Sequence, residues 1–62
     1  MYTLIAHAHS DEPITLGTYR YISDVIEMVE YRVGARAVMT AHTPEYYEYN
    51  HDYIVEIPAD KR

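Results

Sequence analysis

Hydrophobic residues recur with a helical period in one stretch of the chain, residues 18–33. Aliphatic residues three or four positions apart fall on one stripe of that helix: Ile22, Val25, Ile26, Val29 and Val33. The opposite, solvent-facing side is formed by Arg20, Asp24, Glu27 and Tyr31. The pattern predicts an amphipathic helix over residues 18–33 with its apolar stripe packed against a sheet.

The two ends of this helix are marked differently. Gly34 follows the last apolar residue and is expected to end the helix in a left-handed conformation. Thr18 is the predicted N-cap, with Leu16 packing back on the first turn. The alternative is that residues 14–16 start a short hairpin strand and that the helix begins at Ser23.

Alternation with a period of two predicts three strands, at residues 2–9, 35–42 and 51–57. Between the last two strands, residues 44–49 are expected to form a short helical turn, because a threonine, a proline and a glutamate open this segment. Residues 59–62 are expected to fray after Pro58. The sides of the strands expected to face the helix are formed by Tyr2, Leu4, Ala6, Ala8, Ala35, Ala37, Met39, Ala41, Tyr53, Val55 and Ile57.

The predicted order of elements is β-α-β-β. We therefore expect an α+β fold in a single small domain, residues 1–62, with one amphipathic helix packed on a three-stranded mixed sheet whose first two strands are parallel. The face away from the helix would expose Ile5, Val38 and Ile54. Such a patch predicts a homo-oligomer or a bound partner at this face.

Charge and composition exclude some classes of function for this chain and favour others. The chain has 62 residues, ten acidic and five basic, and a formal net charge of −5, without a cluster of Lys or Arg. This balance argues against direct nucleic-acid binding and favours a protein partner with a basic surface. The absence of cysteine, of a secretory leader and of a long apolar run predicts a cytoplasmic location without membrane contact.

Histidines form the first candidate site. His7 and His9 share one strand face, and His42 would lie at the same sheet edge if the first two strands were parallel neighbours. Together with Asp11 and Glu12 they could hold a divalent metal, structural or hydrolytic. No nucleophile with a suitable neighbour and no phosphate-binding glycine loop is visible, so we expect neither an enzyme nor a cofactor.

The second candidate site is the segment 45–56, which contains four acidic residues, four tyrosines and no Lys or Arg. Tyrosines stack on guanidinium groups, and carboxylates accept paired hydrogen bonds from arginine. The residues expected to bind a partner are Glu45, Tyr46, Tyr47, Glu48, Tyr49 and Asp52. The alternative is a solvated loop with two or three of its tyrosines packed onto the sheet.

These features favour a small acidic protein-interaction module. In size and composition the chain resembles the small accessory proteins of bacterial viruses, some of which inhibit host proteins. That resemblance implies a phage-type accessory protein or inhibitor that binds a basic surface of a host protein. The alternatives are the histidine-based metal-binding domain and a structural homo-oligomer.

Overall fold

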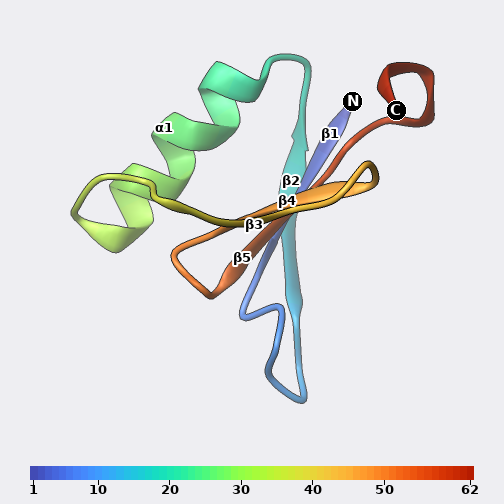
Figure 1. Ribbon diagram of the computed structural model, residues 1–62. Coiled ribbons are helices and arrows are strands. Elements are labelled where there is room, and N and C mark those ends of the chain that lie inside the picture. The colour runs from blue at the N-terminus through green and yellow to red at the C-terminus, as the bar shows by residue number, and fades with distance from the viewer.

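The computed structural model describes residues 1–62 and contains one antiparallel sheet of five strands and one α-helix (Figure 1). Its elements are β1 (Tyr2–Ala6), β2 (Ile14–Tyr19), α1 (Ile22–Val33), β3 (Met39–His42), β4 (Tyr46–Tyr49), β5 (Tyr53–Glu56) and the 3-10 helix η1 (Ala59–Lys61). The strand order across the sheet is β2-β1-β5-β4-β3, and all neighbours are antiparallel.

The predicted three-stranded mixed sheet is wrong. Residues 14–19 form β2, where a loop and a helix start were expected, and residues 46–49 form β4, where a helical turn was expected. Both segments gain ladder hydrogen bonds from an antiparallel neighbouring strand, and the tyrosines of β4 favour strands. The expected second strand, residues 35–42, is shortened to β3, which lies at the far edge from β2.

Helix α1 begins at Ile22, later than predicted. Thr18 belongs to β2, and the N-cap position is taken by Tyr21, whose backbone is extended and whose side chain makes no capping hydrogen bond. The alternative with a hairpin strand and a later helix start is therefore the closer description. The end of the helix is confirmed, because Gly34 has φ 75° and its N–H donates to the carbonyl of Glu30 at 2.8 Å. The structure contains no helix with the length and apolar character needed to cross a bilayer.

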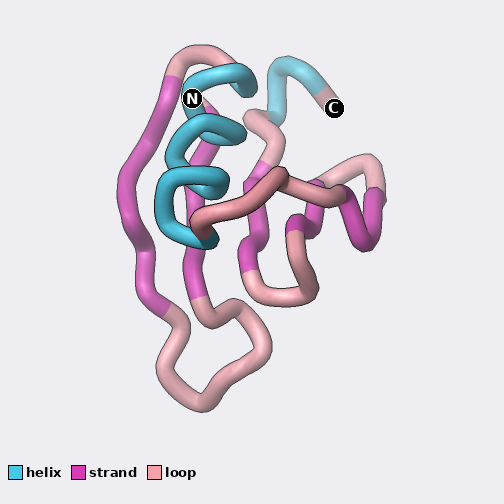
Figure 2. Tube along the Cα trace, turned by 90° about the vertical axis from the view of Figure 1, so that its left-hand side faces the viewer, coloured by secondary structure: helices cyan, strands magenta, loops and turns pink.

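The core lies between α1 and one face of the sheet (Figures 1 and 2). Its buried residues are Leu4, Ala6, Val25, Val29, Tyr49, Tyr53 and Val55. The inward alternation predicted for Leu4 and Ala6, and for Tyr53 and Val55, is confirmed. Val33 closes the predicted stripe but is 37% exposed at the helix end.

A bulge brings one further side chain of β2 toward this core. Leu4 pairs with Gly17 and Ile5 with Thr15, so that Leu16 is an extra residue without an opposite partner. Leu16 packs against the core cluster as a result. Gly17 has φ 153°, a conformation that side-chain-bearing residues rarely adopt, which explains a glycine at this position.

Candidate functional site

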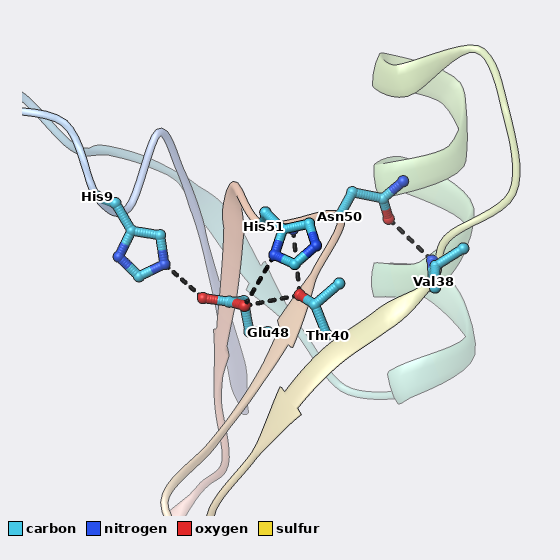
Figure 3. Close-up of polar contacts among 6 residues, drawn as sticks. All are labelled: His9, Val38, Thr40, Glu48, Asn50 and His51. Atoms are coloured by element: carbon cyan, nitrogen blue, oxygen red, sulfur yellow. Dashed lines mark hydrogen bonds and ion pairs between the residues drawn. The ribbon is translucent and has the colours of Figure 1, made fainter.

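Glu48 on β4 is the one polar or charged residue buried in the structure, with 8% of its surface exposed. It lies on the sheet face away from α1, opposite Ala41 of β3 and Ile54 of β5. The Thr40 hydroxyl donates to its Oε2 at 2.7 Å, and His9 Nε2 donates to its Oε1 (Figure 3). Both carboxylate oxygens are therefore satisfied, as a buried charge requires.

A register shift in β3 positions Thr40, and Thr40 in turn contacts His51 of the β4–β5 turn. The β3–β4 register shifts between Met39 and Ala41, so Thr40 is an extra residue whose hydroxyl turns toward Glu48. The same hydroxyl accepts the backbone N–H of His51 at 3.1 Å. His51 Nδ1 lies 4.0 Å from Glu48 Oε2 (Figure 3).

The β4–β5 turn is held by its own side chains. Asn50 and His51 both have positive φ, as the central residues of a type I′ hairpin turn do. The Asn50 carboxamide accepts the N–H of Val38 at 2.9 Å and donates to the carbonyl of Arg36 at 3.2 Å. These bonds tie the approach to β3 onto the hairpin turn.

The β1–β2 loop approaches the same end of the sheet. His7 has φ 53°, and its carbonyl accepts both the N–H and the hydroxyl of Ser10, which folds the loop back. His7 Nδ1 lies 3.2 Å from Asp52 Oδ2, and the N–H of Ala8 donates to the Asp52 carbonyl at 3.0 Å. Together with the bond from His9 to Glu48, these contacts fasten the loop to the β4–β5 hairpin.

Hydrogen bonding favours the ionised form of the Glu48 carboxyl. The bond from Thr40, and then the bond from His9, hold the pKa of the Glu48 carboxyl below its ordinary value, against the opposing effect of burial. Positive charge on His9 and His51 acts in the same direction. Glu48 is therefore an ionised acceptor at neutral pH.

His7, His9 and His42 are not brought together. His42 is on β3, and its ring packs against Tyr47 with ring centroids 4.8 Å apart. The expected convergence assumed that the first strand and the strand after the helix were neighbours, but β5 and β4 lie between β1 and β3. No group of three or more His, Cys, Asp or Glu side chains has a geometry that could hold a metal ion.

The residues predicted to bind a partner divide into two sets. Glu48 and Tyr49 are buried, and burial raises the pKa of the Tyr49 hydroxyl. The accessible set consists of the exposed Glu45 and the half-buried Tyr46, Tyr47 and Asp52. Tyr47 packs against the core cluster, so that Tyr46 is the tyrosine of β4 left on the outer face.

The predicted apolar patch is only partly assembled. Ile5 and Ile54 lie directly opposite each other on β1 and β5, on the face away from α1. Val38 is 56% exposed but precedes β3, and its backbone is bonded to Asn50. Val38 is therefore separate from the two isoleucines.

Glu48, Thr40, His9 and His51 form the Glu48 cluster, a hydrogen-bond network that holds these side chains in place. Glu48 orients the imidazole of His9, whose side chain is 61% exposed. The hydroxyl of Ser10, which follows His9 in the sequence, is bonded to the His7 carbonyl, and the one cavity, about 440 Å³, lies elsewhere, beside Arg20 and Lys61. The cluster consequently supports the hairpin that carries Tyr46.

The sequence analysis did not single out Thr40 as a site residue. It included Glu48 among the partner-binding residues but did not predict that Glu48 is buried. Asn50 between two tyrosine-containing runs was the available hairpin signal, because asparagine tolerates positive φ. Recognising that turn would have placed Glu48 inside a strand.

Comparison of this chain with protein-family models, with curated proteins and with solved structures found no match. Its function is therefore inferred from its own residues.

Proposed function

We propose that this chain is a small acidic protein-interaction module that binds a basic surface of a protein partner through the outer face of its β4–β5 hairpin. The observation that carries this proposal is the pair formed by Tyr46 and Glu56, which lie directly opposite each other on that face. Glu56 is exposed, Tyr46 is half-buried, and neither has a cationic neighbour on the sheet.

A tyrosine beside a carboxylate suits the recognition of arginine. The guanidinium can lie over the tyrosine ring while its N–H groups donate to the carboxylate. Glu45 directly precedes β4 and is exposed, and its carbonyl accepts the N–H of Ile57 at 2.9 Å, so its carboxylate adds to the negative field at this end of the hairpin. The hairpin backbone holds these groups in place, so little conformational entropy is lost on binding.

The distribution of charge supports a basic partner. All five basic residues lie outside the strands: Arg20, Arg32, Arg36, Lys61 and Arg62. None of them lies within ion-pair distance of a carboxylate, since every ion pair in the structure involves histidine. Glu45 and Glu56 are thus not neutralised by any ion pair within the chain, and their field attracts a basic surface.

The outer face also carries apolar side chains beside Tyr46 and Glu56. Ile54 lies two residues from Glu56 on the same side of β5, and Ile5 is opposite Ile54. An apolar centre with a charged rim is the usual composition of a transient protein interface.

Inhibition is the mode of action that we include in this proposal. A small acidic module that covers an arginine-rich groove excludes the nucleic acid or other anion that the groove would hold. This is the action expected of a phage-type accessory protein. We place it in the cytoplasm, because a chain without cysteine needs no oxidising compartment.

The experiment is a titration of the isotope-labelled protein with a short arginine-rich peptide, followed by amide chemical shifts. We expect the largest shifts at residues 45–46 and 54–56. The Glu45→Lys/Glu56→Lys variant should bind about tenfold more weakly, because a charge-assisted contact contributes about 1.5 kcal/mol.

The matched control is Asp24→Lys/Glu27→Lys, which makes the same change in net charge on the exposed face of α1. It should retain most of the affinity. Equal weakening by both variants would show only general charge attraction, and shifts centred away from the hairpin would refute the proposed surface.

A further inference from the structure

We propose that β2 is a self-association edge, through which two copies of this chain pair in antiparallel fashion to form one continuous sheet. β2 is the outermost strand on its side and is bonded only to β1. The hydrogen-bonding groups on its other edge are free to pair with a further strand. A strand that pairs antiparallel with its own copy forms a closed two-fold dimer.

β2 lacks most of the features that protect edge strands from pairing. It is the longest strand, with six residues, and contains neither a charged residue nor a proline. The opposite edge, β3, has four residues and a register shift beside Thr40. The bulge at Leu16 interrupts β2 at its middle, so we assign the intermolecular bonds to the segments on either side of it.

Charge complementarity favours a second copy as the occupant of this edge. When β2 is paired with itself about its midpoint, Thr15 of one copy lies opposite Thr18 of the other. In this register the acidic pair Asp11 and Glu12, just before β2, approaches Arg20, which directly follows β2 in the other copy. Arg20 has no ion pair within its own chain, and the symmetry creates the contact twice.

Apolar area near the same edge would be covered. Ile14 is 49% exposed at the start of β2 and would lie opposite Tyr19 of the second copy. Tyr21, which is 60% exposed just beyond β2, would lie near Glu12 of the second copy. The uncharged strand thus has an apolar contact at each end.

The dimer has a consequence that rests on the proposed function. The symmetry axis of an edge-to-edge antiparallel pair is perpendicular to the sheet, so both α1 helices lie on one face and both outer faces point the other way. β2 is separated from β4 by β1 and β5. Two Tyr46–Glu56 pairs would therefore face the same side, which allows bivalent binding.

The test is the solution mass by light scattering over a range of protein concentrations, for the wild type and three variants at the exposed positions 15 and 18. We expect the wild type to reach twice the 7.3 kDa mass of the chain. Thr15→Glu/Thr18→Glu and Thr15→Lys/Thr18→Lys place like charges opposite each other and should be monomers. Thr15→Lys/Thr18→Glu pairs opposite charges and should restore the dimer.

The two like-charge variants change the net charge of the chain in opposite directions. If net charge alone controlled association, the two variants would therefore differ in their degree of dimerisation. A monomeric wild type at every concentration overturns the proposal, as does a dimer that all three variants retain. A monomeric Lys/Glu variant beside a dimeric wild type overturns the antiparallel register.

Amide hydrogen exchange of the wild type keeps the proposal testable if a variant does not fold. Protection of β2 amides should rise with protein concentration, while that of β3 amides should not. A dimer without concentration-dependent protection in β2 overturns the proposal.

Discussion

At the scale of single residues, the outer sheet face is distinguished by one buried charged side chain, that of Glu48. A carboxylate with 8% exposure is stable there because Thr40 and His9 occupy its two oxygens. A charge-reversing change at this position would leave an ammonium beside two donors in a buried site. Glu48 is thus a structural residue within a segment whose other acids are accessible.

Glu48 predicts a specific pH dependence of stability. Its pKa is lower in the folded chain than its ordinary value, so its hydrogen bonds stabilise the fold above that ordinary value. This contribution is lost as the pH falls through the folded pKa. Since Glu48→Gln cannot ionise, the excess unfolding free energy of the wild type over this variant should shrink on acidification.

Urea unfolding of both proteins between neutral and acidic pH measures this difference. Glu27→Gln on the exposed face of α1 is the control and should parallel the wild type. A wild-type advantage that stays constant down to acidic pH would contradict the assigned role of Glu48.

At the scale of elements, each terminus of α1 is decided by different physics. The end is local, because Gly34 adopts φ 75° where other residues are strained. The start is not local, because Thr18 has a good capping side chain but is used by the β1–β2 ladder instead. A cap preference of about 1 kcal/mol is smaller than the gain from several ladder bonds and Leu16 packing.

The helix end yields a stability prediction. A Cβ on Gly34 would meet no atom within 4 Å, so a substitution acts through backbone strain alone. Gly34→Ala should lower the unfolding free energy by about 1 kcal/mol. Gly34→Asn should cost clearly less, because asparagine tolerates this conformation. Denaturant midpoints with unchanged slopes measure both values, and equal losses for the two variants would contradict the strain account.

At the scale of the whole molecule, few opposite charges are paired within the chain. The net charge is −5, and no Lys or Arg pairs with a carboxylate. Self-repulsion therefore opposes folding, with few attractive pairs to balance it.

Added salt should consequently stabilise the monomer. At a protein concentration low enough to prevent association, raising the ionic strength to about 0.5 M should screen repulsion worth about 0.5 kcal/mol and raise Tm by about 3 °C. Thermal unfolding in increasing sodium chloride measures the shift. A Tm that falls with salt would show that attractive ion pairs dominate.

The sequence by itself determined those features that depend on local periodicity and chirality. The stripe with Val25 and Val29, the glycine that ends α1, and the inward alternation of Leu4 and Val55 all follow from the rotation per residue of helices and strands. Nothing distant in the chain is needed to predict them.

Only the tertiary structure decided between a strand and a helix start at residues 14–19, and it alone decided the strand order and the assembly of the Glu48 cluster. A strand is stable only with a partner, and its partner is chosen by packing over the whole sheet. His9 meets Glu48 across 39 positions of sequence, and Thr40 reaches it through a register shift. Contacts of this kind leave no periodic trace in the sequence, because they depend on how whole elements pack together.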